Sequence, residues 1–151
     1  MKKLLGSRLF VAVSMLVISV VDGRAEARTI ELTGNDTMQY STKIIEVKAG
    51  EKIKIVFKNV GTLPVEAMGH NIVFLKKGTD VAAFCTAGIT AKNTDYIAAD
   101  QNDKVIAKTK LLGPGEQDEV EFTAPLDPGD YPYVCTFPGH FALMQGVMQV
   151  K

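Results

Sequence analysis

The 151-residue sequence predicts an all-β fold, a Greek-key β-sandwich with one short helix or flap. Many of its segments alternate apolar and polar residues, which is the period of a half-buried strand. Glycine and proline separate these segments and supply the dihedral angles that chain reversals require. Many short strands with turn signals, in a domain of about 120 residues, favour a sandwich of two sheets.

Eight segments are predicted as strands. In segment 52–59, Ile53, Ile55 and Phe57 share one face, whereas lysines occupy most of the other face. Such alternation places one face against a core and the other in water. The complete set of predicted strands is 29–33, 44–47, 52–59, 71–75, 104–110, 117–123, 129–135 and 146–151.

One region interrupts the strand pattern. Residues 79–91 are rich in alanine, and Thr79 or Asp80 is a candidate N-cap, so a short helix or flap is predicted there. A polar loop, 92–102, follows it. The sequence has no internal repeat and no low-complexity segment.

The first 27 residues are typical of a secretory signal peptide. Lys2, Lys3 and Arg8 form a basic region, residues 9–21 are apolar, and small residues follow. A membrane-spanning helix needs about 20 apolar residues, so an uncleaved membrane anchor is the less favoured alternative. We therefore expect one exported, periplasmic domain, residues 28–151, without stable membrane insertion after cleavage.

The charge balance excludes some classes of partner. The whole chain is neutral, and removing a leader with four basic and two acidic residues leaves a net charge of −2. Nucleic acids and anionic membrane surfaces bind strongly basic proteins. Neither is expected as a partner of this domain.

The C-terminal region contains a metal-site pattern, Cys135-x4-His140-x3-Met144, and the other histidine of the chain is His70. A thiolate, two imidazoles and a weak thioether ligand are the donor set of a blue-copper electron-transfer centre. Zinc also binds cysteine and histidine, but the methionine and the absence of carboxylates from the loop favour copper. A single cysteine in the loop favours one copper ion.

Cys85 is the second cysteine. In an oxidising compartment, a disulfide between Cys85 and Cys135 is the alternative interpretation of the pair. It is disfavoured because it would remove the thiolate from the metal-site pattern. We expect Cys85 to be a buried structural thiol.

Two motifs give the chain a specific resemblance. Met68-Gly69-His70-Asn71 and Cys135-Thr-Phe-Pro-Gly-His140, followed by Ala-Leu-Met144, resemble the motifs of the azurins in the cupredoxin family. Weaker similarity covers 34–39 and 105–111, so the resemblance extends through essentially the whole mature chain. It implies a cupredoxin-like sandwich.

The resemblance also implies a ligand set: His70, Cys135 and His140 in a trigonal arrangement, with Met144 and the Gly69 carbonyl on the axis. Asn71 would hold the cysteine loop by hydrogen bonds, and the Phe137 amide would donate to the thiolate. Hydrogen bonds to a ligating sulfur tune the potential of a metal site.

An apolar docking patch around the edge of His140 is a further implication of the resemblance. The matching positions are Met38, Leu63, Pro64, Met68, Phe137, Pro138, Ala142 and Leu143. Phe141 replaces the small polar residue usual beside this histidine, and would either enlarge the patch or partly shield His140. Glu66 adds a charge near the rim that could select partners.

The chain departs from the azurin pattern at other positions. A disulfide remote from the metal is replaced by Arg28 and Glu51, so a covalent brace that would stabilise the fold is missing. Ile72 stands where many azurins carry a buried tryptophan.

The function expected from these observations is the shuttling of single electrons by Cu(I)/Cu(II) cycling, without enzymatic activity. Expected partners are redox proteins such as cytochromes or copper and haem oxidoreductases. A periplasmic copper store or chaperone is the alternative, and a zinc-bound adhesion domain is a third hypothesis.

Overall fold

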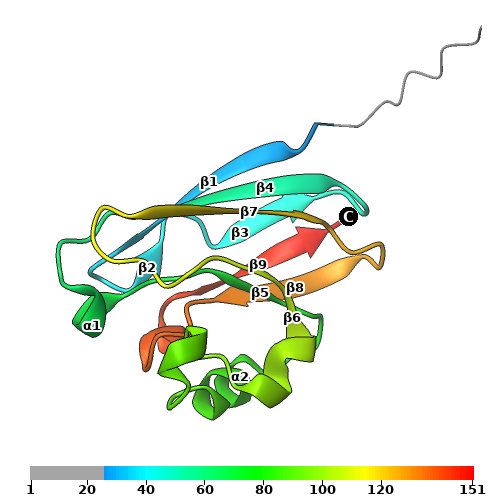
Figure 1. Ribbon diagram of the computed structural model, residues 1–151. Helices are drawn as coiled ribbons and strands as arrows, with labels where there is room; N and C mark the ends of the chain where they lie inside the picture. The colour runs from blue at the N-terminus through cyan, green and yellow to red at the C-terminus, as the bar shows by residue number, and fades with distance from the viewer. Residues whose placement is uncertain (1–25) are drawn as a thin grey trace, which may run out of the picture.

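The alternating segments form two stacked sheets in the computed structural model, which describes residues 26–151 (Figure 1). The strands are β1 (Arg28–Asn35), β2 (Gln39–Tyr40), β3 (Ile44–Val47), β4 (Lys52–Asn59), β5 (Val73–Leu75), β6 (Val105–Lys108), β7 (Gln117–Thr123), β8 (Gly129–Val134) and β9 (Gln145–Val150). The helices are α1 (Val65–Met68) and α2 (Val81–Ala87), with 3-10 turns η1 (Lys92–Thr94), η2 (Ala99–Lys104) and η3 (His140–Ala142).

One sheet has the strand order β2-β1-β4-β7, and the other has the order β3-β9-β8-β5-β6. Most neighbours are antiparallel, but β1 pairs in parallel with β4, and β3 pairs in parallel with β9. Parallel neighbours cannot be joined by a hairpin, so the chain crosses between the sheets. The all-β, cupredoxin-like sandwich predicted from the sequence is confirmed.

Strand β4 shows how the alternation builds the core. Ile53, Ile55 and Phe57 are fully buried, whereas the lysines between and beside them are partly or fully exposed. These side chains face Phe74, Tyr133 and their neighbours from the second sheet in one apolar cluster. Burial of aliphatic and aromatic side chains, at roughly 1.5–3 kcal/mol each, is the main stabilising contribution.

All eight predicted strands are present, with ends that shift by no more than two residues. The prediction missed β2, because a strand of two residues has no measurable periodicity. Asp80 is the N-cap of α2, and its carboxylate accepts a hydrogen bond from the Ala83 amide at 3.0 Å. The helix ends at Ala87, with Gly88 as its C-cap, earlier than predicted.

The expectation of one short helix or flap was incomplete. The structure adds α1, a single turn that follows Pro64, and the three 3-10 turns. Helices of three to six residues are too short for an apolar period to be visible in the sequence.

The expected signal peptide, residues 1–27, lies almost entirely outside the described residues. Among residues 26–151, no helix has the length and apolar character needed to cross a bilayer. Cys85 and Cys135 are both free thiols. The alternative disulfide between them is therefore not present in the structure.

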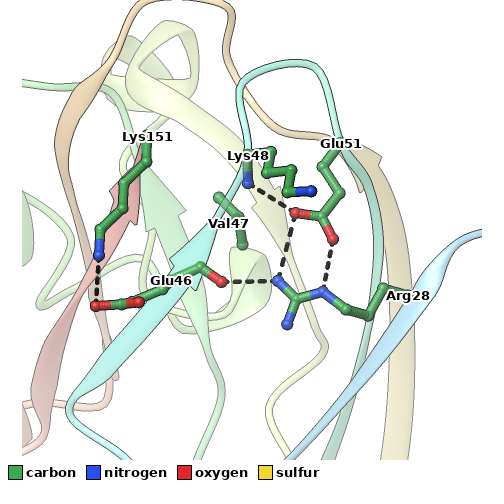
Figure 2. Close-up of a pocket in the computed structure, with 6 residues that line it drawn as sticks. All are labelled: Arg28, Glu46, Val47, Lys48, Glu51 and Lys151. Atoms are coloured by element: carbon green, nitrogen blue, oxygen red, sulfur yellow. Dashed lines mark hydrogen bonds and ion pairs between the residues drawn. The ribbon is translucent and has the colours of Figure 1, made fainter.

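The two residues that replace the disulfide of the azurin pattern form an ion pair at the start of β1 (Figure 2). The Nε of Arg28 donates to Oε1 of Glu51 at 2.6 Å, and Nη2 donates to the backbone carbonyl of Glu46 at 2.7 Å. The other carboxylate oxygen of Glu51 accepts from the Lys48 amide at 2.7 Å. A polar contact thus joins β1 to the turn between β3 and β4.

Candidate metal centre

The three equatorial candidates lie at the end of the sandwich that is remote from Arg28. Cys135 follows β8 directly, His140 opens η3, and His70 lies between α1 and β5. The Cys135 and His70 side chains are fully buried, and His140 is 4% exposed. Gly139 has a φ of 82°, so the turn that delivers His140 uses a conformation that favours glycine.

The ligand atoms of these residues form a compact triangle. The Sγ of Cys135 lies 4.0 Å from Nδ1 of His70 and 3.6 Å from Nδ1 of His140. The ligand atoms of the three residues lie within 4.8 Å of one another. Three ligands coplanar with a metal, each about 2.0–2.3 Å from it, lie about 3.5–4.0 Å apart. The donor set therefore fits one metal ion of this size.

Burial has opposite electrostatic effects on the thiol and the imidazoles. It raises the pKa of Cys135 to about 11, although the backbone amides of Asn71 and Phe137 donate toward the sulfur and oppose this rise. It lowers the pKa of His140 to about 4 and also lowers the pKa of His70. Neutral imidazoles are ready to ligate, and a bound cation would offset the cost of a buried thiolate.

Two backbone hydrogen bonds with Leu112 hold His70 in place. Its amide donates to the Leu112 carbonyl at 3.1 Å, and the Leu112 amide donates back at 2.8 Å. The His70 Nε2 makes no hydrogen bond of acceptable geometry within residues 26–151. Burial lowers the pKa of His70, and the nearby Asn35 carbonyl acts in the opposite direction and raises it.

The expected axial groups also lie at this end of the fold. Met144 is fully buried, its amide donates to the His140 carbonyl at 2.8 Å, and its carbonyl accepts from the Cys135 amide at 3.0 Å. The Gly69 carbonyl oxygen lies 3.9 Å from the Cys135 sulfur. The Gly69 carbonyl therefore lies beside the triangle, and the Met144 backbone is hydrogen-bonded to two of the ligand residues.

Asn71 connects the two segments that carry the ligands. Its Oδ1 accepts from the Thr136 amide at 2.9 Å, and its Nδ2 donates to the Thr136 hydroxyl at 2.8 Å. The Thr136 hydroxyl donates in turn to the Asp95 carbonyl at 2.6 Å. These bonds link the loop after β8 to the segment after His70 and to the turn that follows η1.

Aromatic rings pack against the same loop. The Phe137 ring lies 4.5 Å from the His140 ring, measured between centroids, and 5.4 Å from the Tyr96 ring. Asp95 and Tyr96 both have left-handed φ values near 60°, a costly conformation for residues other than glycine. Their placement is maintained by contacts with the ligand loop.

Sequence reasoning missed three polar residues that support the site, Asn59, Thr136 and Asp95. The buried Asn59 amide donates to the Leu112 carbonyl at 3.0 Å, and its oxygen accepts from the Gly61 amide at 2.9 Å. Its position at a strand end is its only sequence signal. Thr136 is adjacent to Cys135, so proximity to a ligand could have identified it.

The expected docking patch is divided between exposed and packed side chains. Leu63 and Leu143 are 43% and 52% exposed. Three others are only partly exposed: Met38, Met68 and Pro138. Phe141 is half-buried and packs against a second apolar cluster that includes Phe84 and Cys85 of α2. Docking by this surface stays a prediction.

Comparisons with known proteins place the site in a family. The sequence model of copper-binding proteins of the plastocyanin/azurin family matches residues 27–151. Azurin from Alcaligenes faecalis is 42% identical over 125 residues, covering 80% of this chain and 96% of the azurin. Auracyanin from Roseiflexus castenholzii superposes with a TM-score of 0.72 at 41% identity, covering 83% of this chain and 98% of auracyanin.

A third relative is longer than this chain. Outer membrane protein H.8 from Neisseria gonorrhoeae is 44% identical over 122 residues, covering 80% of this chain. The match spans 64% of that relative, less than two thirds of its length. The histidine–cysteine triangle and these similarities agree on copper as the cofactor. The chain belongs to the plastocyanin/azurin family of copper-binding proteins.

Proposed function

We propose that this protein is a type 1 copper electron carrier that shuttles single electrons between redox proteins and is not an enzyme. The observation that supports this most directly is the buried triangle of one thiol and two imidazoles. Copper bound there would supply a one-electron Cu(I)/Cu(II) couple. Cytochromes and copper or haem oxidoreductases are suitable partners.

His70, Cys135 and His140 would hold the copper ion, and Met144 and the Gly69 carbonyl are the proposed weaker ligands. The Asn71 and Phe137 amides donate toward the cysteine sulfur and favour its anionic form. Weak ligands and hydrogen bonds to a ligating sulfur tune the potential of a copper site, so these contacts would set its potential.

The frame around the site suits electron transfer. Two segments supply the ligands, and the Asn71–Thr136 hydrogen bonds join these segments inside the protein. A braced site has little need to rearrange when its charge changes. His140 is 4% exposed, next to the exposed Leu143, so its ring edge is the proposed portal for electrons.

The proposed location is the periplasm. The basic and apolar pattern of residues 1–27 supports export and cleavage, which would leave residues 28–151 as the working domain. Retention of the leader as an anchor would instead hold the domain at a membrane. Mass spectrometry of the mature N-terminus from the periplasmic fraction distinguishes the two.

The proposal is tested by adding Cu(II) to the metal-free domain and recording absorption and EPR spectra. We expect an intense blue thiolate-to-copper band and a narrow hyperfine splitting. Cys135→Ser removes the thiolate and should abolish the band. Cys85→Ser is the matched control, because Cys85 lies in the separate cluster at α2, and it should stay blue. A pale parent protein, or a blue Cys135→Ser variant, contradicts the proposal.

The storage or chaperone alternative makes a different prediction for the reduced protein. A carrier retains copper through repeated reduction and oxidation, whereas a chaperone releases Cu(I) to an acceptor. Copper should therefore remain bound during redox cycles in the presence of a moderate Cu(I) chelator. Loss of copper within the first cycles favours the alternative.

A further inference from the structure

Gly34 is a residue beside the metal centre to which no role has been assigned so far. It lies near the end of β1, opposite Tyr40 of β2 on one side and Asn59 of β4 on the other. Its carbonyl accepts from the Val60 amide at 2.8 Å. Neighbouring strands on both sides leave the backbone at Gly34 little freedom to move.

Backbone conformation does not explain the glycine. Gly34 is not among the positive-φ glycines, so other residues can adopt its backbone geometry. Glycine in a strand interior weakens the strand and often marks a place where another group approaches closely. The reason for Gly34 must therefore lie in the space beside it.

That space is occupied by the proposed axial ligand. A Cβ atom at position 34 would lie 2.6 Å from the Met144 methyl carbon, 3.0 Å from the Phe57 Cζ and 3.4 Å from the His70 Cδ2. The first distance is below any ordinary carbon–carbon contact. The methyl group of Met144 thus overlaps the space that the first side-chain atom of another residue would need.

We propose that Gly34 is a positioning residue for the axial ligand. Because glycine has no side chain, it leaves a space that the Met144 methyl group fills, here called the methyl seat. This seat sets how the thioether lies beside the triangle. The inference rests on the proposed copper function for its redox consequence, but the seat itself is a property of the metal-free protein.

The neighbours of Gly34 decide which group would move. Phe57 is fully buried and its ring packs edge-on against Tyr40, with centroids 5.7 Å apart. A rigid ring inside a close-packed core yields less readily than an unbranched thioether chain. A methyl group added at position 34 should therefore displace Met144 before it displaces Phe57.

The first test uses the metal-free domain. Gly34→Ala and Met144→Ala are made singly and together, and thermal unfolding is measured for all four proteins. We expect Gly34→Ala to lower Tm in the parent and to have a clearly smaller effect in the Met144→Ala background, because the clashing methyl is absent. Equal losses in both backgrounds mean that Phe57 or the backbone bears the clash, and overturn the proposal.

A matched control separates this effect from glycine replacement in general. A Cβ at Gly113 has its nearest neighbour, the Val65 Cβ, at an ordinary distance of 3.4 Å. Gly113→Ala should therefore show no coupling to Met144→Ala. If Gly34→Ala does not fold but the double variant does, the proposal stands. If neither folds, the clash is with the rigid core and the proposal is wrong.

A second readout follows the ligand itself. With 13C-methyl methionine, Gly34→Ala should shift the Met144 methyl resonance in the metal-free protein, whereas Gly113→Ala should leave it in place. In the copper-loaded protein, Gly34→Ala should change the rhombicity of the EPR signal and the reduction potential. An unmoved methyl resonance refutes the seat. A parent protein without a type 1 spectrum refutes the proposed function. It does not refute the methyl seat, which the measurements on the metal-free protein test.

Discussion

The Arg28–Glu51 ion pair should contribute measurably to stability, and its contribution can be estimated from its exposure. The Arg28 side chain is 48% exposed and the Glu51 side chain is 21% exposed, so solvent screens the pair substantially. Exposed ion pairs contribute about 0.2–1 kcal/mol. Glu51→Gln removes this charge interaction but keeps an acceptor for the Lys48 amide, so a loss of about 0.5–1 kcal/mol is expected.

Glu51→Ala removes the acceptor as well. The hydrogen bond from the Lys48 amide, at 2.7 Å, adds about 0.5–1.5 kcal/mol, so the total loss should be about 1–2.5 kcal/mol. For a domain of this size each kcal/mol lowers Tm by about 3–6 °C. This is at or below the contribution of about 2–4 kcal/mol typical of a disulfide.

The assay is urea and thermal unfolding of the metal-free domain at low and high salt. At 1 M salt the screening length is about 3 Å, so most of the Glu51→Gln penalty should disappear. The matched control is Glu46→Gln, because the Lys151–Glu46 pair has a similar length, 2.7 Å, but is 61% exposed on both sides. The control should change stability by less than about 0.5 kcal/mol.

The ion pair should also make stability depend on pH, in a direction that follows from the pKa of Glu51. The hydrogen bond from Arg28, followed by that from the Lys48 amide, lowers the pKa of Glu51. A carboxyl whose pKa is lower in the folded state stabilises the fold above its unfolded pKa and loses this contribution as pH falls through the folded pKa. The difference between the parent and Glu51→Gln should shrink in acid. Equal stabilities at neutral pH and low salt would refute the reasoning.

Three further predictions concern the metal centre. Asn59→Leu leaves the Gly61 amide without its acceptor and should destabilise the metal-free domain by about 1–3 kcal/mol in urea unfolding; an unchanged midpoint contradicts the assigned role. Thr136→Val removes the hydroxyl that links Asn71 to the neighbouring turn and should speed amide exchange in the cysteine loop, while exchange in β4 stays as in the parent. Burial raises the pKa of Cys135 to about 11, so Cu(II) binding should release the thiol proton. The apparent Cu(II) affinity in competition titrations should therefore rise about tenfold per pH unit between pH 6 and 9. A flat pH profile contradicts this prediction.

The identity of the ligands was predictable because most of the candidate ligands lie close together in the sequence. Cys135, His140 and Met144 lie within ten residues, so one loop had to bring them together. The remaining histidine, His70, was the available fourth candidate. Strands such as β4 were equally predictable, since alternation with period two is a local property of the sequence.

The supporting contacts were not predictable in the same way. Asn59 and Leu112 are 53 positions apart, and Asn71 and Thr136 are 65 apart. Whether a polar side chain makes such a bond depends on which strands become neighbours. Phe141 illustrates the same limit, because its packing against the α2 cluster depends on where the helix lies.

The sequence by itself determined the class of fold, the metal-binding residue types and their order along the chain, because hydrophobic periodicity and ligand chemistry are carried by single residues and short spacings. Only the tertiary structure decided that Arg28 and Glu51 form an ion pair, that Asn59 and Thr136 brace the site, and that Gly34 leaves room for Met144. Those features depend on the distances between segments remote in sequence, which exist only once the two sheets have packed.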